Sequence, residues 1–513
     1  MAANAISDAA TMRGAMKVLI ANRGEIAVRV MRACREMGYP TVAVYSEPDR
    51  AALHVVSADQ AMPIGAAPSR ESYLRIDRIL DAAKKSGADA IHPGYGFLAE
   101  NAEFARACRD AGLLFIGPSP ESIDAMGSKT ESRQRMIAAG VPVVPGLTEP
   151  VKSFDEIEAF AREAGFPIMI KASAGGGGKG MRLVEREEDL RSSFERVTSE
   201  AGSFFGDSSV YAEKYVTSPR HIEVQVVGDQ HGNIVHVGER ECTLQRRHQK
   251  VVEEAPSPVV DEALRAQLGA MAVKAAAAVN YYSTGTIECL MGPDRQFYFL
   301  EMNTRLQVEH PVTEMVWNVD LVKEQLRIAR GEKLSFRQED LRPNGHAIEC
   351  RVYAEDPARK FAPSPGLIRY INLPQGPGVR NDQGVYAGYT VPVYYDPILS
   401  KLIVHGPTRE EAIARMRRAL DEYRVEGIST TIPFFTFIMN NPDFISANFD
   451  TGYIDRILPT LDFAKDSAET NTDAAIAAAA ILAFEQAQNV KLPEDGPSRW
   501  REIGRAEAMR GRL

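Results

Sequence analysis

The chain has 513 residues, of which 44% are hydrophobic and 25% charged, and its formal net charge is −9. This length exceeds what one hydrophobic core serves and predicts about three domains. The composition is ordinary for a soluble globular enzyme, and the negative charge excludes an overall basic field for binding nucleic acid or an anionic membrane.

The cysteines and apolar runs indicate the compartment. The five cysteines are scattered with no C-x-x-C spacing, so the sequence predicts neither a disulfide framework nor a zinc site. The longest apolar run, residues 474–484, has 11 residues, against the ~20 needed to cross a bilayer. The first 15 residues lack the basic start and apolar centre of a signal peptide. We predict a cytoplasmic protein without membrane or nucleic-acid partners.

The N-terminal residues are predicted to alternate between strands and helices. Residues 17–21 and 41–45 are predicted strands, and the apolar residues between them recur at helical spacing. A strand at 88–91 and a helix at 98–111 follow, separated by a Pro-Gly turn. Residues 1–128 are therefore predicted to form a Rossmann-like α/β domain with a parallel, doubly wound sheet.

A glycine motif follows the strand at 88–91. Residues 94–99, Gly-Tyr-Gly-Phe-Leu-Ala, match the G-x-G-x-x-A form of NAD sites. No acidic residue clearly closes the next strand at 115–117, so a structural turn is favoured. An NAD oxidoreductase stays open as an alternative, which nicotinamide binding would reveal.

A smaller unit is predicted over residues 142–217, with a helix at 154–164 and strands at 167–172 and 210–214. Its centre holds four glycines between two lysines, and such a flap lets backbone amides approach phosphate oxygens: Lys171, Gly175, Gly176, Gly177, Gly178 and Lys179. A Walker loop would need Ser or Thr where Gly180 stands. We interpret the unit as a mobile lid, with a plain linker as the alternative.

Strands dominate the middle of the chain, and a mixed region follows. The predicted strands cover residues 222–227, 233–241, 285–291 and 296–303, and a helix ends near 331. An alanine-rich helix is predicted for 473–489. The predicted domains are 1–128, 129–340 with its lid, a mixed α+β domain at 341–460, and a helical extension at 461–513.

A donor-rich stretch lies at residues 239–250. It contains Gln245, Arg246, Arg247, His248 and Lys250 within six positions. A solvated charged loop is one interpretation, and a polyphosphate site is the other. Cys242 is not favoured as a nucleophile because nothing in the sequence places a base beside it.

Residues 301–309 carry the clearest chemical pattern. In an extended strand, every second side chain shares a face, which would align Glu301, Asn303, Arg305, Gln307 and Glu309. The first two suit a hard cation, the next two a small oxyanion, and the last could move a proton. If the strand bearing Glu288 lies alongside, its carboxylate adds a third oxygen ligand, which favours Mg²⁺ or Mn²⁺ over zinc.

Taken together, these residues resemble the biotin carboxylase component of biotin-dependent carboxylases, in the ATP-grasp superfamily. The resemblance extends over nearly all of residues 17–455. The motifs that carry it are residues 21–27, 92–98, 175–181, 245–254, 301–314, 349–351, 363–366 and 389–392.

The resemblance implies where ATP and metal bind. ATP would lie between the lid and the central sheet, and Glu288, Glu301 and Asn303 would hold two Mg²⁺ or Mn²⁺ ions. The implied ATP-binding residues are Lys129, Lys171, Gly175, Gly176, Gly177, Gly178, Met181, Glu213, Lys214, Tyr215, Val216, His221, Gln245, His248, Leu290, Glu288 and Glu301.

The resemblance also implies the reaction. Bicarbonate would sit on Arg305, Gln307 and the amide of Val308, and Glu309 would deprotonate it for attack on the γ-phosphate near Lys250. The carboxyphosphate formed would break down to CO₂ and phosphate in a closed site, and the phosphate would take the N1 proton of biotin. Arg351 would then stabilise the biotin enolate, with Tyr95 also near the biotin.

Partners follow from the same resemblance. The 513 residues contain no Met-Lys-Met biotin-attachment site, which implies a separate biotin carboxyl carrier protein and carboxyltransferase subunits. Arg32, Glu36 and Arg380 match a homodimer surface of the family, although Pro377 stands where an aromatic residue is seen in a relative. A carbamoyl phosphate synthetase type of ligase is the nearest rival, and a regulatory subunit without turnover is a further one.

Overall fold

The computed structural model describes residues 15–147, 149–151, 153–173, 180–205, 208–461, 463, 476–484, 503–504 and 506–507. The chain divides into two compact units, Met1–Thr460 and Leu461–Leu513. In the second unit a helix covers 476–484, inside the stretch predicted as helical, and the tail from 498 lies mostly outside the described residues. Within the described ranges, no helix has both the length and the apolar character that spanning a bilayer requires.

The N-terminal part of the first unit is built on a five-stranded parallel sheet in the order β3-β2-β1-β4-β5. This confirms the predicted Rossmann-like arrangement. The helix expected from residue 98 begins at Ala102, because the Asn101 side chain accepts a hydrogen bond from the Phe104 amide and caps it there. The elements are β1 (Val18–Ile20), α2 (Gly24–Glu36), β2 (Thr41–Ser46), α3 (Leu53–Ser57), β3 (Gln60–Gly65), α4 (Ile76–Ser86), β4 (Ala90–His92), α5 (Ala102–Asp110), β5 (Leu114–Phe115), α6 (Pro120–Gly127) and α7 (Lys129–Ala138).

The lid residues form a small α/β layer around a three-stranded antiparallel sheet, β7-β6-β8. The predicted helix at 154–164 is confirmed, whereas α9 was not predicted. Apolar residues of both helices and the sheet, including Ile157, Ile170 and Val197, give this layer its own core. The four glycines at 175–178 lie outside the described residues. The elements are α8 (Phe154–Ala164), β6 (Ile168–Ala172), β7 (Met181–Val184), α9 (Leu190–Phe205) and β8 (Val210–Lys214).

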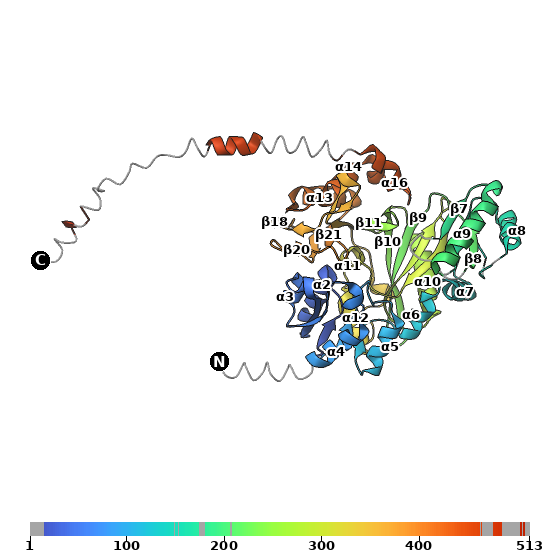
Figure 1. The fold of residues 1–513 in the computed structure, drawn as a ribbon, viewed down its shortest axis with the longest axis horizontal. Coiled ribbons are helices and arrows are strands. Elements are labelled where there is room, and N and C mark those ends of the chain that lie inside the picture. The colour runs from blue at the N-terminus through green and yellow to red at the C-terminus, as the bar shows by residue number, and fades with distance from the viewer. Residues whose placement is uncertain are drawn as a thin grey trace. The chain divides into compact units, whose positions relative to one another are not determined.

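The centre of the first unit is an eight-stranded antiparallel sheet in the order β13-β12-β9-β10-β11-β14-β21-β19 (Figure 1). The sheet contains strands from both sides of the predicted domain boundary at residue 341. Across this boundary β11 pairs with β14, for example Val252 with Cys350. The expected second and third domains therefore share one sheet. Its strands are β9 (Arg220–Gly228), β10 (Ile234–Arg246), β11 (Gln249–Ala255), β12 (Ser283–Met291), β13 (Phe297–Asn303), β14 (His346–Tyr353), β19 (Val379–Gln383) and β21 (Ile398–Gly406).

Helices and short strands surround this sheet. Apolar residues of α2, α11 and α12 pack in one cluster with residues of both sheets, which joins the N-terminal part to the centre. The helices are α10 (Glu262–Ala277), α11 (His310–Trp317), α12 (Leu321–Ala329), α13 (Arg409–Glu422), α14 (Ile432–Asn440), α15 (Pro442–Ile445) and α16 (Tyr453–Ile457). The short strands are β15 (Glu355–Asp356), β16 (Ala362–Pro363), β17 (Gly366–Leu367), β18 (Tyr370–Asn372), β20 (Thr390–Val391) and β22 (Arg424–Glu426).

One local prediction is wrong, and one of two open interpretations is not supported. The extended strand expected over 301–309 stops at Asn303, and a loop leads to Glu309, the N-cap of α11. Arg305, Gln307 and Glu309 are thus presented by a loop, not by strand alternation. The donor-rich stretch at 239–250 is not a loop either: β10 and β11 form a hairpin whose tight turn holds Arg247 and His248 at positive φ.

Candidate functional site

Three carboxylates form a row across adjacent strands of the central sheet. Glu288 on β12 is the register partner of Glu301 on β13 and of Glu223 on β9. The predicted adjacency of Glu288 and Glu301 is therefore confirmed. Glu223 was not singled out from the sequence, although it alternates with His221 and Gln225 along β9, a pattern that could have indicated it.

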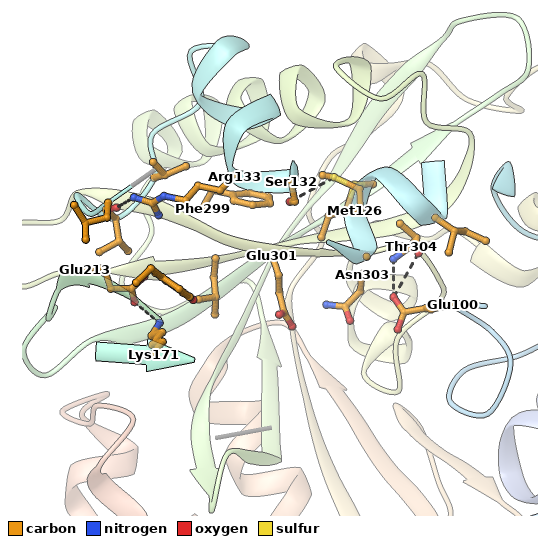
Figure 2. Close-up of a pocket in the computed structure, with 18 of the residues that line it drawn as sticks. Glu100, Met126, Ser132, Arg133, Lys171, Glu213, Phe299, Glu301, Asn303 and Thr304 are labelled. Carbon is orange, nitrogen blue, oxygen red and sulfur yellow. Dashed lines mark hydrogen bonds and ion pairs between the residues drawn. The ribbon is translucent and has the colours of Figure 1, made fainter. Parts of the chain in front are cut away.

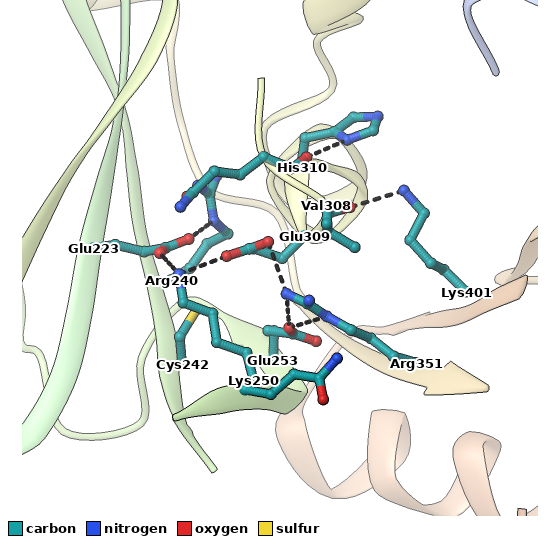
Figure 3. Close-up of polar contacts among 12 residues, drawn as sticks. Glu223, Arg240, Cys242, Lys250, Glu253, Val308, Glu309, His310, Arg351 and Lys401 are labelled. Carbon is teal, nitrogen blue, oxygen red and sulfur yellow. Dashed lines mark hydrogen bonds and ion pairs between the residues drawn. The ribbon is translucent and has the colours of Figure 1, made fainter. Parts of the chain in front are cut away.

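Lys250 is the cation at the centre of the site (Figure 3). Its Nζ lies 2.5 Å from Glu223 Oε2, 2.8 Å from Glu288 Oε1 and 2.7 Å from Glu309 Oε1. Burial acts to lower the pKa of Lys250, but the three carboxylates outweigh burial and raise it well above its usual value. The side chain is consequently a permanent positive charge.

Each carboxylate oxygen of Glu309 is paired with one cationic side chain. Besides Lys250, Arg351 donates from Nη2 to Glu309 Oε2 at 2.9 Å. Burial alone would raise the pKa of Glu309, but Lys250 and Arg351 hold it well below its usual range. Glu309 is thus ionised at neutral pH and has the charge state that a proton acceptor needs.

Arg351 is oriented by a second carboxylate. Its Nε donates to Glu253 Oε1 at 2.6 Å, and Figure 3 shows its guanidinium between Glu253 and Glu309. Burial raises the pKa of Glu253 to about 7 despite the neighbouring arginine. Arg351 is buried and anchored on one side, which leaves its position little freedom.

Arg240 lies beneath the site and was not predicted. It is fully buried and forms an ion pair with Glu223. It also donates to Gln307 Oε1 at 2.9 Å, and its other acceptors are Gln225, Thr286 and Thr313. Because Gln307 belongs to the loop before Glu309, the hydrogen bond from Arg240 connects that loop to β10 of the central sheet.

Nitrogen donors surround the Glu288 carboxylate, and its role as a metal ligand together with Glu301 and Asn303 stays a prediction. Glu288 Oε1 accepts hydrogen bonds from Asn303 Nδ2 at 2.9 Å and from Gln307 Nε2 at 2.7 Å. His221 Nε2 lies 3.2 Å from Glu288 Oε2. Burial would raise the pKa of Glu288, but Lys250 and His221 bring it well below its usual value. An ionised carboxylate is the type of ligand that Mg²⁺ takes, and donor atoms of His221, Glu223 and Glu288 lie within 4.8 Å of one another.

Arg305 connects this row to the N-terminal part of the chain. Its Nε donates to Glu100 Oε2 at 2.8 Å, and its Nη2 donates to Asn303 Oδ1 at 2.8 Å. Glu100 also accepts from the Thr304 amide at 3.0 Å. Glu100, which the sequence did not indicate, therefore holds the start of the loop that leads to Glu309 (Figure 2).

A cavity of about 280 Å³ lies between the lid sheet and β13 (Figure 2). Lys171 and Glu213 of the lid form an ion pair on one side of it, and Glu301 and Asn303 line the other. Met181 is the register partner of Lys171 on the next strand. The Lys129 side chain and the four glycines lie outside the described residues.

The remaining residues predicted to bind the nucleotide lie either at the end of β8 or on the central sheet. Lys214 Nζ donates to the carbonyls of Ala164, Gly165 and Phe166, so this side chain caps the end of α8. Tyr215 and Val216 follow directly after β8.

The central sheet carries the others. Leu290 pairs with His221. Gln245 donates to the Cys242 carbonyl at 3.0 Å, and His248 is exposed in the β10–β11 turn. Cys242 is fully buried, and burial raises the pKa of its thiol well above its usual value, which removes it as a nucleophile.

A second cavity, of about 470 Å³, opens beside Arg351. Tyr95, Arg305, Val308 and Arg351 line it together with Arg23. The loop before α11 thus contributes to both cavities, with Thr304 lining the first and Arg305 and Val308 lining the second. Residues 94–97 make turns with positive φ, and α5 starts only at Ala102, so the NAD interpretation loses the helix that it requires.

Family comparisons cover most of the chain. Residues 14–123 match the model "Biotin carboxylase, N-terminal domain", and residues 349–456 match "Biotin carboxylase C-terminal domain". Residues 128–337 match "Carbamoyl-phosphate synthase L chain, ATP binding domain". The flanking matches separate this chain from the carbamoyl phosphate synthetase rival, which shares only the nucleotide-binding part.

Individual relatives agree. The biotin carboxylase of Halalkalibacterium halodurans is 55% identical over 438 residues, which are 85% of this chain and 97% of the relative. One pyruvate carboxylase subunit of Methanothermobacter thermautotrophicus is 53% identical over 446 residues, 87% of this chain and 91% of the relative.

Solved structures are similar to the same extent. The Campylobacter jejuni biotin carboxylase complex with β-γ-ATP superposes with a TM-score of 0.82 at 49% identity, over 86% of this chain and 98% of the other. The biotin carboxylase domain dimer of Hydrogenobacter thermophilus 2-oxoglutarate carboxylase, with MgADP and bicarbonate, gives 0.81 at 49%, over 86% and 97%.

Proposed function

Since the chain belongs to the biotin carboxylase family and catalyses the ATP-dependent carboxylation of biotin with bicarbonate, we propose that its chemistry takes place where Lys250, Glu309 and Arg351 meet. The reaction converts ATP, bicarbonate and biotin into ADP, phosphate and N1-carboxybiotin. The observation that carries the assignment is the ionised Glu309 carboxylate, buried and held by two cations.

In this proposal Glu309 takes the proton of bicarbonate. Arg305, Gln307 and the Val308 amide hold the anion, since all lie on the loop that ends at Glu309. Lys250 neutralises the phosphate that bicarbonate attacks to form carboxyphosphate. Phosphoryl transfer depends mainly on alignment and charge neutralisation, which these groups supply.

ATP then occupies the space between the lid and the central sheet. Lys171 of the lid and Glu301 of β13 line that cavity from opposite sides. Glu288, Glu301 and Asn303 would hold Mg²⁺, which neutralises phosphate charge when bound. Closure of the lid would exclude water from carboxyphosphate.

Biotin is assigned to the cavity beside Arg351. Arg351 and Tyr95 line it from different parts of the chain, and the guanidinium is placed to stabilise negative charge on the ureido oxygen. We propose that a biotin carboxyl carrier protein presents this biotin, and that the chain dimerises through Arg32, Glu36 and Arg380. All five cysteines are free and buried, which is compatible with the reducing cytoplasm.

We further propose an acyl-CoA carboxylase as the holoenzyme, using acetyl-CoA or propionyl-CoA. A two-subunit pyruvate carboxylase is the second candidate, because the pyruvate carboxylase subunit of Methanothermobacter thermautotrophicus is 53% identical. Carboxyl transfer from the carboxylated carrier to each acceptor, measured with each type of carboxyltransferase, separates the two. We also propose the domain limits 1–128, 129–340, 341–460 and 461–513.

The deciding experiment measures ADP release with free biotin, with and without bicarbonate, for the wild type and Glu309→Gln. We expect wild-type turnover to require bicarbonate and Mg²⁺, and the variant to lose at least ~100-fold, as for loss of a general base. Glu241→Gln, which alters a buried carboxylate paired with Arg220, is the control. Undiminished turnover of Glu309→Gln would refute the assigned role.

A further inference from the structure

Lys401 is a fully buried lysine that no step of the proposed reaction uses. It lies on β21, where its register partners are Arg351 on β14 and Asp382 on β19. Its Nζ donates to the Val308 carbonyl at 2.8 Å (Figure 3). Burying an ammonium group costs several kcal/mol unless it is paired and hydrogen-bonded. A buried lysine aimed at a backbone carbonyl next to Glu309 therefore calls for a specific role.

The peptide group that Lys401 contacts sets the backbone orientation of Glu309. The Val308 carbonyl belongs to the peptide group between Val308 and Glu309, so a donor on that oxygen orients the Glu309 backbone. The preceding carbonyl, of Gln307, accepts from His310 Nδ1 at 2.8 Å. Two successive carbonyls of the loop are thus held by buried side chains.

Lys401 and Arg351 act on the same residue from neighbouring strands. They are register partners on β21 and β14, so both side chains leave the same face of the sheet. Arg351 reaches the Glu309 carboxylate, and Lys401 reaches the backbone just before it. Together they constrain both ends of Glu309.

The counter-ion of Lys401 comes from the N-terminal part of the chain. Glu25, in the first turn of α2, places Oε2 3.3 Å from Lys401 Nζ. Burial raises the pKa of Glu25 to about 7 even beside this lysine, which reflects how completely the pair is withdrawn from water. The Tyr95 ring, which lines the cavity beside Arg351, lies 5.7 Å from the same ammonium.

We propose that Lys401, paired with Glu25, is a positioning residue for bicarbonate deprotonation: it orients the Val308–Glu309 peptide and couples the N-terminal α2 to the base. The inference rests on the proposed function, because it assumes that Glu309 is the base. The proposal predicts that changing Lys401 alters kcat/KM for bicarbonate without altering the KM for ATP.

The test compares Lys401→Met, Lys401→Arg and Glu25→Gln with the wild type in bicarbonate-dependent ADP release. We expect Lys401→Met to lower kcat/KM for bicarbonate by about 10- to 100-fold, as for a misplaced catalytic group, with the KM for ATP unchanged. Lys401→Arg should restore part of this loss because it keeps the donor, and Glu25→Gln should lower the same parameter less.

Arg409→Gln is the matched control, because it also breaks a buried ion pair, with Glu254, but touches no residue of the loop. It should lower the melting temperature and leave bicarbonate kinetics unchanged. The proposal is overturned if Lys401→Met changes bicarbonate kinetics no more than this control, or changes the kinetics of ATP and bicarbonate equally.

If Lys401→Met does not fold, Glu25→Gln decides, and wild-type bicarbonate kinetics in that variant overturn the proposal. Glu309→Gln is measured in parallel: full bicarbonate-dependent turnover there refutes the proposed base itself, whereas an inactive Glu309→Gln with an unaffected Lys401→Met refutes only the role of Lys401.

Discussion

Glu349 and Glu253 face each other as register partners across the ladder between β14 and β11. Both are fully buried, and neither Glu349 oxygen has a hydrogen-bond partner among the described residues. Burial, reinforced by the charge of Glu253, raises the pKa of Glu349 well above its usual value, although Lys401 opposes this. Burial therefore disfavours the charged form of this carboxyl group, two residues before Arg351 on β14.

This relationship predicts a pH-dependent stability difference. A carboxyl group with a raised folded-state pKa stabilises fully below its unfolded pKa, and this contribution is lost as pH rises towards the folded value. We expect the melting temperature of Glu349→Gln, relative to wild type, to increase from pH 5 to pH 8.5. Differential scanning calorimetry measures this, and a pH-independent difference would contradict it.

Removing Lys250 should change the titration of Glu309. Lys250 is the main charge that depresses this pKa, so Lys250→Met should raise it and move the acidic limb of the bicarbonate-dependent rate to higher pH, with much lower turnover. The pH–rate profile with free biotin is the measurement. Lys85→Met, which removes an exposed lysine paired with Asp81, should leave the profile in place.

Removing one proposed metal ligand should weaken the binding of Mg²⁺. Glu288→Gln takes away the carboxylate that lies between Glu223 and Glu301 in the sheet register, and we expect the Mg²⁺ concentration for half-maximal ADP release to rise about tenfold or more. Calorimetric titration with MgADP provides an independent check. Equal Mg²⁺ requirements in wild type and variant would count against Glu288 as a ligand.

Arg240 is expected to be a major stabilising residue. Arg240→Met would leave Gln225 Oε1 and Gln307 Oε1 without this buried donor, and Glu223 would keep Lys250 as a cationic partner. Breaking a buried ion pair in this way costs about 3–5 kcal/mol of unfolding free energy, which chemical denaturation can measure. Arg75→Met removes an exposed pair with Asp77 and should cost less than about 1 kcal/mol.

Deleting residues 466–513 should separate catalysis from assembly. The catalytic groups all lie in the unit Met1–Thr460, so ADP release with free biotin should persist. The tail from 498 carries five arginines against two glutamates, and we propose that it docks a carrier or carboxyltransferase subunit. Co-purification of subunits tests this, and intact holoenzyme assembly with full coupled activity would refute it.

Several features followed from the sequence because they depend on local pattern. The parallel N-terminal sheet follows from strand and helix periodicity. The helix at 154–164 was predicted with its observed bounds. The adjacency of Glu288 and Glu301 follows from two alternating strands close in sequence. In each case the decisive interactions lie within the segment or between neighbouring segments.

The loop between β13 and α11 shows where such reasoning fails. Alternation placed Arg305, Gln307 and Glu309 on one strand face, yet the strand ends at Asn303. Glu100, Arg240 and Lys401 hold this loop from distant parts of the chain. Local periodicity carries no information about such partners, although a lone lysine inside the apolar strand 398–406 was a visible signal.

The sequence by itself determined the kinds of chemical groups, the family resemblance and the alternation of strands and helices in the N-terminal part. Only the tertiary structure decided that Lys250 serves three carboxylates and that Glu309 is ionised between Lys250 and Arg351. The reason is physical: the charge state of a buried group depends on its desolvation and on charges within a few ångströms, and folding alone brings those charges together.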